Sequence, residues 1–379
     1  MVNTVHIITG LDVGGAEKAL FRLLAKRTAP YFNPSVISLL EKGVVGHQLQ
    51  SLGIPVYSLG MRRGLPGPRA LIRLCGLLKK LAPDLIQGWM YHGNLAATAA
   101  TSSLGLEIPV LWNIRQSLYE LSKERRLTRG VIYGGAWLSG RPRLILYNSK
   151  TSAFQHEAIG FKPEKTRIIP NGFDCTEYQP DRIRRKQVRR ELAISPPTVL
   201  IGLIARYHPM KDHANFLRAA AELIRGGAGM RVAFLLAGRG IDPSNGSLIK
   251  LIRQLDLSSK VILLGERQDV PRLMPALDIA TVASAWGEGF PNVLGEAMAC
   301  GIPCVATDVG DSAYLIGGMG KVVPPRDFRA LAAAWQNLIA AGVKGRKQWG
   351  DKARGRIIEH FNLSEIVRQY EKLYLEVTS

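Results

Sequence analysis

Cysteine is scarce in this sequence, with four residues among 379. They are Cys75, Cys175, Cys300 and Cys304, and only the last two lie close together, as a Cys-x3-Cys pair. That pair has neither the spacing nor the second ligand pair of a structural zinc site. We therefore interpret the four cysteines as reduced, mostly buried thiols.

Long apolar runs are also missing. A helix that spans a bilayer needs roughly 18–20 predominantly apolar residues, and no stretch reaches that length. Near the N-terminus, the apolar run Val5–Thr9 meets Gly10 and Asp12 too soon to be the hydrophobic region of a signal peptide. The sequence therefore predicts a cytoplasmic protein.

Acidic residues are too few to balance the basic ones, with 30 Asp+Glu against 50 Lys+Arg and a formal net charge of +20. The imbalance lies in the first half, where residues 1–190 hold 28 basic and 12 acidic residues; residues 191–379 hold 22 and 18. Such a positive field attracts phosphorylated ligands, anionic lipid headgroups or nucleic acid through the same Coulombic attraction. A basic surface that serves only solubility is the alternative.

The sequence does contain a regular alternation of strand and helix patterns. Short apolar runs alternate with amphipathic stretches, which is typical of parallel βαβ units with helices on both faces of the sheet. The expected strands are 5–8, 35–38, 56–59, 85–87, 110–112 and 144–147, then 199–204, 231–237, 260–264, 279–283, 303–307 and 321–323. With 39 glycines for tight turns and enough residues for two cores, the chain is predicted to form two doubly wound α/β domains.

A composition break separates the two sets of strands. Residues 181–190 are polar and basic, and Ser195-Pro196-Pro197 follows them, which is typical of a linker. We predict one domain over residues 1–180 and a second over 191–362. A last amphipathic helix, expected over 363–379, follows the second sheet and is predicted to pack back on the first domain.

Two glycines follow the first expected strand, in Gly10-Leu11-Asp12-Val13-Gly14-Gly15-Ala16-Glu17-Lys18. The spacing is neither Gly-x-Gly-x-x-Gly nor a P-loop, so it gives little support to a dinucleotide or ATP site. Gly14 and Gly15 would let the backbone approach a ligand closely and would direct helix N–H groups at an anion. A tight turn without a ligand is the alternative.

Polar residues follow two later strands of the first domain. His92 and Arg115 each come just after a strand, where open α/β sheets place their ligands. His92 could be catalytic or structural, and Arg115 could pair with a phosphate or with a neighbouring carboxylate. Near the domain junction, Ile169-Pro170-Asn171-Gly172 is interpreted as a turn.

In the second domain a basic loop follows the first strand. Arg206 and Lys211 lie five residues apart in this loop, and Asp212 is the expected cap of the next helix. The two cations could neutralise a diphosphate, Arg206 through a bidentate guanidinium contact and Lys211 as a point charge. A solvated basic loop is the alternative.

The most specific unit is a loop and helix over residues 284–301 with Glu-x7-Glu spacing. Pro291 suits the first helical position and Gly301 the C-terminal cap, so the helix is predicted over about 291–300. Glu288 then lies in the loop, beside free N–H groups of the first turn, and Glu296 lies on the second turn. This favours recognition of sugar hydroxyls over a glycosidase, which needs two carboxyls flanking one bond. An ordinary helix with two surface glutamates is the alternative.

Together these segments resemble the family-4 retaining glycosyltransferases of the GT-B fold, particularly bacterial enzymes of surface polysaccharide assembly. The resemblance extends over nearly the whole chain, from Val13-Gly14-Gly15-Ala16-Glu17 through 169–172 and 206–211 to 288–296. It implies two Rossmann-like domains facing across a cleft. The first would bind the acceptor and the second the nucleotide-sugar donor.

The resemblance also implies roles for single residues. Arg206 and Lys211 would bind the donor diphosphate, Glu296 the ribose hydroxyls, and Glu288 the sugar, aided by the Gly289 loop and the backbone N–H groups of Phe290 and Asn292. Gly14 and Gly15 would approach the phosphate and acceptor, and His92 would contact the transferred sugar. Many relatives have Gly where this chain has Pro291, which removes one N–H donor.

By resemblance, a UDP-sugar would be the donor and a glycan, lipid-linked in the expected case, the acceptor. Retention would follow from a front-face mechanism in which the leaving diphosphate helps to deprotonate the acceptor. No cofactor or metal is expected, because Arg206 and Lys211 can stabilise the leaving group and the expected cleft loops have no Asp-x-Asp motif. A non-hydrolysing nucleotide-sugar epimerase shares the fold and is the alternative; a sugar phosphorylase would need a pyridoxal phosphate lysine, for which no context is seen.

A non-catalytic protein that binds nucleic acid or membranes is the other alternative, although no nucleic-acid motif accompanies the charge. Basic and apolar residues are interleaved in one segment: Arg125, Arg126 and Arg129 among Leu118, Tyr119, Leu121, Val131, Ile132 and Trp137. This pattern suits docking on an anionic membrane, which would place the protein peripherally at the inner face of the plasma membrane.

Overall fold

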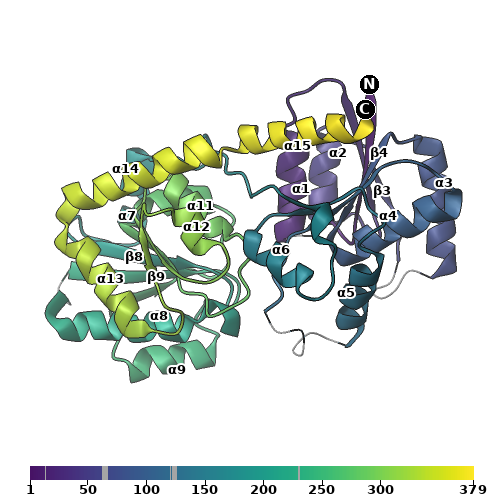
Figure 1. The fold of residues 1–379 in the computed structure, drawn as a ribbon. Helices are drawn as coiled ribbons and strands as arrows, with labels where there is room; N and C mark the ends of the chain where they lie inside the picture. Colours follow the sequence, from purple (N-terminus) through teal and green to yellow (C-terminus); the bar gives the residue numbers. More distant parts are fainter. Residues whose placement is uncertain (13, 62–66, 120, 122–125, 229–230) are drawn as a thin grey trace. The chain divides into compact units, whose positions relative to one another are not determined.

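The computed structural model describes residues 1–379 except 13, 62–66, 120, 122–125 and 229–230. It divides into two compact units. The first comprises Met1–Gly172 and Leu363–Ser379, and the second comprises Phe173–Asn362 (Figure 1). Each unit has its own parallel sheet, so the predicted fold class of two doubly wound α/β domains is confirmed.

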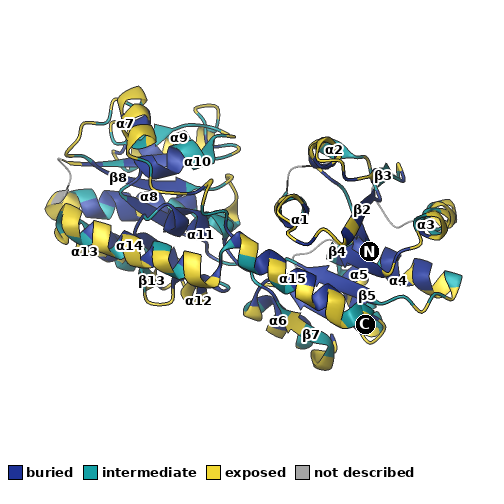
Figure 2. Ribbon diagram, turned by 90° about the horizontal axis from the view of Figure 1, so that it is seen from above, coloured by how far each residue is buried: buried dark blue, intermediate teal, exposed yellow. Residues whose placement is uncertain are grey.

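The first unit is built on a seven-stranded parallel sheet with the order β3-β2-β1-β4-β5-β6-β7. Its strands are β1 (Val2–Ile8), β2 (Phe32–Ser38), β3 (Val56–Ser58), β4 (Leu85–Trp89), β5 (Val110–Ile114), β6 (Leu144–Tyr147) and β7 (Thr166–Ile168). The central strands are buried on both faces, which explains their continuous apolar sequence (Figure 2). The strand order reverses between β1 and β4, and this is where doubly wound sheets bind ligands.

Helices cover both faces of this sheet. One face packs against α3 (Pro68–Leu81), α4 (Met90–Leu104), α5 (Arg126–Leu138) and α6 (Lys150–Glu157). The other face packs against α1 (Gly15–Ala25), α2 (Gly43–Ser51) and the C-terminal α15 (Leu363–Thr378).

Helix α15 belongs to the first unit although it is last in the chain. The buried Glu371 carboxylate accepts hydrogen bonds from the backbone N–H groups of Thr28 (2.7 Å) and Ala29 (3.0 Å). Tyr374 donates to Gln87 of β4, and Tyr370 lies in the same apolar cluster. These contacts fix α15 to the first unit, and Figure 1 shows the helix in yellow beside α1.

The second unit has a six-stranded parallel sheet with the order β10-β9-β8-β11-β12-β13. Its strands are β8 (Val199–Ile204), β9 (Val232–Ala237), β10 (Val261–Leu263), β11 (Ile279–Val282), β12 (Cys304–Thr307) and β13 (Lys321–Val323). One face packs on α8 (His213–Leu223), α9 (Gly246–Gln254) and α13 (Phe328–Ala340). The other packs on α7 (Arg182–Glu191), α10 (Val270–Leu273), α11 (Asn292–Ala299), α12 (Ser312–Ile316) and α14 (Gly342–His360).

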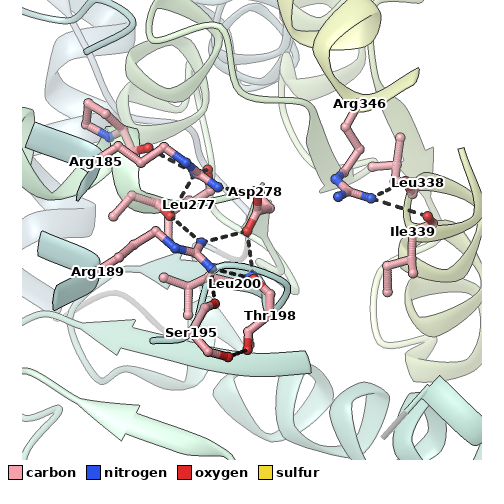
Figure 3. Close-up of polar contacts among 12 residues, drawn as sticks. Arg185, Arg189, Ser195, Thr198, Leu200, Leu277, Asp278, Leu338, Ile339 and Arg346 are labelled. Atoms are coloured by element: carbon pink, nitrogen blue, oxygen red, sulfur yellow. Dashed lines mark hydrogen bonds and ion pairs between the residues drawn. The ribbon is translucent and has the colours of Figure 1, made fainter. Parts of the chain in front are cut away.

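The segment interpreted as a linker is a helix, which corrects the sequence interpretation. Helix α7 is capped by Asp181 and attached to the second unit through Asp278, which forms ion pairs with Arg185 (2.6 Å) and Arg189 (2.9 Å) (Figure 3). Arg189 also donates to the carbonyl oxygen of Ala276. Its basic sequence therefore serves a buried ion-pair network, and the units divide earlier, between Gly172 and Phe173, rather than between 180 and 191.

Candidate active site

Two loops meet at the point in the second sheet where the strand order reverses. One follows β8 and contains Arg206 and Lys211, and the other follows β11 and contains Glu288. The N–H of Ala285 donates to the carbonyl oxygen of Met210 at 2.8 Å. At Gly287, where φ is +76°, an added Cβ would lie 2.6 Å from the Met210 sulfur, so a residue with a side chain would be strained there. The loops are therefore packed directly on each other.

An ion pair joins these loops. Lys211 Nζ contacts Glu288 Oε1, and the hydroxyl of Ser284 donates to the same oxygen. The Glu288 side chain is 9% exposed and that of Lys211 is 21% exposed. A buried carboxylate needs such compensation because burying an unpaired charge costs several kcal/mol. The structure thus brings together two residues that the sequence placed in separate motifs.

Arg206 lies at the start of the same basic loop, with an exposed side chain. It forms no hydrogen bond or ion pair with another described residue. The backbone beside it is held by Tyr207 N–H, which donates to Arg239 O at 2.8 Å, and by Gly238, where an added Cβ would lie 2.2 Å from Ala205 O. Asp212 caps α8 as predicted, accepting from Asn215 N–H. The loop therefore presents a free guanidinium on a fixed backbone.

The glutamate loop continues into helix α11, which begins at Asn292. Pro291 is the N-terminal cap, not the first helical residue as predicted, because its ψ of 110° is extended. The Phe290 ring is buried and stacks on the ring of Phe173, with 6.3 Å between the ring centroids. Only the backbone of Phe290 can therefore face a ligand. Gly289 O accepts from Asp311 N–H at 2.9 Å.

Glu296 lies on the second turn of α11, as predicted, and is 6% exposed. Its neighbour Gly295 packs under the ring of Phe173, where an added Cβ would lie 2.0 Å from a ring carbon. This close contact fixes the helix and explains a glycine inside it.

The other predicted site residues, Gly14, Gly15 and His92, belong to the first unit. Gly14 is the N-terminal cap of α1, and His92 lies in the first turn of α4. The two helices follow β1 and β4, which are paired neighbours, so the residues lie at the same edge of the sheet where its order reverses. Burial lowers the pKa of the His92 imidazole, which favours its neutral form. Val13, part of the same motif, lies outside the described residues.

Sequence reasoning missed two features of this edge. Met90, the first residue of α4, has φ of +61°. This left-handed conformation is energetically unfavourable for any residue that has a side chain. The carboxylate of Glu17 lies over Gly14, where an added Cβ would be 2.2 Å from Oε2, and burial raises its pKa. Two signals for these features were available in the sequence. The first is that a helix starts directly after a strand at Met90, and the second is that Glu17 is an acidic residue at the third helical position of α1.

The Asn171 turn also has a role that the sequence did not reveal. Asn171 Oδ1 accepts from the guanidinium of Arg115, and Asn148 donates to the same oxygen at 3.2 Å. The next residue, Gly172, packs against α15, where an added Cβ would lie 2.7 Å from the Leu363 Cα. The turn therefore joins Arg115 to the start of the C-terminal helix.

Two family profiles match this chain. A profile described as "Glycosyltransferase Family 4" matches residues 13–177, and one described as "Glycosyl transferases group 1" matches residues 198–341. Between them they span most of the chain.

Curated relatives and solved structures point the same way. The protein EpsF of Bacillus subtilis is 34% identical over 212 residues, which is 54% of each chain. An Escherichia coli enzyme, UDP-Gal:alpha-D-GlcNAc-diphosphoundecaprenol alpha-1,3-galactosyltransferase, is 22% identical over 82% of this chain and 79% of its own. The crystal structure of Anabaena HepE in complex with UDP has a TM-score of 0.85 and 23% identity, covering 99% of this chain and 100% of HepE.

The chain spans about half the length of the Bacillus relative. The likeness to HepE shows a shared fold, and the two profiles cover both units. The structure has two Rossmann-like units, and the profiles and the shared fold match both of them. The chain therefore belongs to the family-4 glycosyltransferases of the GT-B fold.

Proposed function

We propose that this protein is a hexosyltransferase that moves a sugar from a UDP-sugar to a lipid-linked glycan, with retention of anomeric configuration, in surface polysaccharide biosynthesis. The observation that carries the proposal is the Lys211–Glu288 ion pair, held between two loops at the reversal point of the second sheet. It offers a cation for a diphosphate beside a carboxylate for sugar hydroxyls. HepE was solved with UDP and with UDP-glucose, and the E. coli relative is named for a diphosphoundecaprenol-linked acceptor, which supports both substrate classes.

The proposed donor contacts follow from the geometry. Arg206 is exposed and free to form a bidentate contact with phosphate, and Lys211 can share its charge between Glu288 and the diphosphate. Glu288 and the N–H groups of Phe290 and Asn292 would bind the sugar, with Gly289 as part of the same loop. Glu296 would bind the ribose hydroxyls.

In the proposed reaction the bond between the sugar C1 and the diphosphate oxygen breaks. The acceptor oxygen bonds to C1 on the same face, and the acceptor proton passes to the departing diphosphate. Arg206 and Lys211 stabilise the charge that develops on that group, a role that needs no metal. From the first unit, His92 would contact the transferred sugar, and Gly14 and Gly15 would leave room for the acceptor.

We expect UDP to raise the melting temperature of the protein more than ADP, GDP or CMP does in a thermal-shift panel, because the proposed donor is a UDP-sugar. EDTA should leave the UDP effect unchanged. With a preferred UDP-sugar and acceptor, proton NMR of the first-formed product should show the donor's anomeric configuration. An inverted product would contradict the front-face mechanism, and conversion of the UDP-sugar without any acceptor would indicate the epimerase instead.

The proposed membrane-docking surface needs correction. Of the apolar residues that the sequence interleaved with arginines, Leu118, Val131 and Ile132 are core residues. Trp137 is 83% exposed, and α5 also exposes Leu127 and Tyr133 on the same helix. Arg126 is exposed as well, whereas Arg125 lies outside the described residues. No helix of the described chain is both long and apolar enough to cross a bilayer.

We therefore keep an anionic membrane surface as a proposed partner and assign it to the exposed residues of α5. Trp137→Glu should reduce flotation with phosphatidylglycerol vesicles at low salt by about tenfold, because it removes the apolar anchor and adds repulsion. Trp137 is the most exposed of the six tryptophans, so vesicles should also shift the fluorescence of the wild type to shorter wavelength. Phe154→Glu, at an exposed aromatic on α6, is the matched control. Equal flotation of the two variants would rule out α5 as the docking helix.

A further inference from the structure

Arg115 lies just beyond the carboxyl end of β5 and has three contacts, all with neutral groups. One guanidinium nitrogen donates to the hydroxyl of Tyr370 at 3.3 Å, and another donates to Asn171 Oδ1. The guanidinium also lies over the ring of Trp89, the last residue of β4, 5.7 Å from its centroid. These contacts hold the side chain from three separate elements of the first unit.

No carboxylate among the described residues forms an ion pair with Arg115. Another cation, Arg22 of α1, acts on it, and burial together with the charge of Arg22 lowers the pKa of Arg115. A desolvated cation is costly when it has no counter-ion, and proteins normally compensate it with an anion. The sequence left two partners open for Arg115, phosphate or a neighbouring carboxylate, and the described structure supplies no carboxylate.

The surroundings of Arg115 are built to orient it. Tyr370 accepts a second hydrogen bond, from Asn113 at 3.0 Å, and Asn171 accepts one from Asn148. Asn113 and Asn148 are buried, so these acceptors are fixed in place. A guanidinium has five N–H donors. Arg115 donates to Tyr370 and Asn171 and is only partly buried, so donors remain for a ligand.

We propose that Arg115 is the centre of an anion subsite in the first unit that binds a phosphate or diphosphate group of the acceptor. The identification of the ligand as the acceptor rests on the proposed function, whereas the anion subsite itself does not. The position supports it: Arg115 follows β5, next to β4, whose end leads into α4 and His92. A planar guanidinium with N–H groups left to donate suits phosphate oxygens, and the second cation, Arg22, adds to the attraction.

The test uses the full-length protein and inorganic pyrophosphate as the probe. Because pyrophosphate should also occupy the donor cations, the measurement is made in a Lys211→Ala background. Pyrophosphate should still raise the melting temperature there, and adding Arg115→Gln should weaken the apparent affinity about 10- to 100-fold. Arg115→Lys, which keeps the charge but loses the bidentate guanidinium, should retain part of the rise in melting temperature. Arg141→Gln, at an exposed arginine of the same unit, should retain all of it.

A pyrophosphate response that is unchanged by Arg115→Gln would overturn the proposal, as would a protein that is destabilised by the substitution yet binds the anion normally. A variant that binds soluble pyrophosphate normally but loses binding to phosphatidylglycerol vesicles would also overturn it, because the ligand would then be a lipid headgroup. With a phosphorylated acceptor, Arg115→Gln alone should raise the acceptor KM while leaving the Kd for UDP unchanged.

The two proposals can fail separately. If the wild type binds no UDP but its pyrophosphate response depends on Arg115, the donor assignment fails and the subsite stands. If UDP binds and sugar is transferred, but Arg115→Gln leaves both the acceptor KM and the pyrophosphate response unchanged, the subsite fails and the glycosyltransferase stands.

Discussion

Replacement of Lys211 by alanine should lower kcat/KM for sugar transfer by about 10²- to 10³-fold, the usual effect of removing one charged or hydrogen-bonding group that stabilises developing charge. Lys211 is the only cation paired with Glu288 in the described structure. Its loss removes a positive charge from the proposed diphosphate site and leaves the buried carboxylate with the Ser284 hydroxyl alone. Steady-state kinetics and calorimetric titration with UDP would measure the two effects.

Stability and catalysis have to be separated in that experiment. Lys211→Ala is expected to lower the melting temperature, whereas the double variant Lys211→Met with Glu288→Gln should recover stability because no unpaired charge remains buried. Neither variant should recover transfer. Lys352→Ala, at an exposed lysine of the same unit, should behave as the wild type.

Glu296 provides an independent check on the donor site. Glu296→Ala should also weaken binding of the nucleotide sugar, because Glu296 is the proposed partner of the ribose hydroxyls. If both Glu296→Ala and Lys211→Ala bound the donor with wild-type affinity, the assignment of the second unit to the donor would be wrong.

Replacement of Asp278 by alanine should cost about 3–5 kcal/mol of unfolding free energy, the typical result of removing one partner from a buried ion pair. The Asp278 carboxylate accepts from Arg185 and Arg189 and from the backbone N–H of Leu200 at 2.8 Å (Figure 3). The Arg189 side chain is 8% exposed, so its charge would remain in the interior without a counter-ion. Urea unfolding followed by circular dichroism would measure the loss.

The ion pair Lys347–Asp351 gives the matched control. Both of its side chains are more than half exposed, so Asp351→Ala should change stability by no more than about 1 kcal/mol. If Asp278→Ala had a similarly small effect, α7 would not be anchored to the second unit through this carboxylate. A double variant with Arg189→Met should recover part of the loss, because it removes the unpaired charge.

Much of the fold follows from periodicity in the sequence. The central strands are continuous apolar runs because helices cover both faces of each sheet, and the glycine-rich turns between them mark strand ends. The helix boundaries at Asp212 and near Gly301 follow from local capping. Pro291 was misplaced by one position because proline fixes φ but not ψ, and the extended ψ of 110° makes it the cap.

Helix α7 could not be recognised in the same way. A run such as 181–190 has too few apolar residues to show a buried face, so its composition is typical of a solvated linker. Its burial depends on Asp278, which lies about ninety residues later in the chain. The same limit applies to Leu118, Val131 and Ile132. Their interleaving with arginines suggested an exposed surface, but in the structure they belong to the apolar core of the first unit.

The sequence by itself determined that the chain forms two doubly wound α/β units, because strand periodicity is a local property. It also predicted which loops would carry ligand-binding residues, because these loops follow the carboxyl ends of parallel strands. Only the tertiary structure decided which charges are paired. Lys211 and Glu288 are 77 residues apart and meet because β8 and β11 are neighbours. Arg115, by contrast, is surrounded by neutral partners from residues 89, 171 and 370. The free energy of a charge depends on its neighbours in space, which the order of residues in the chain does not specify.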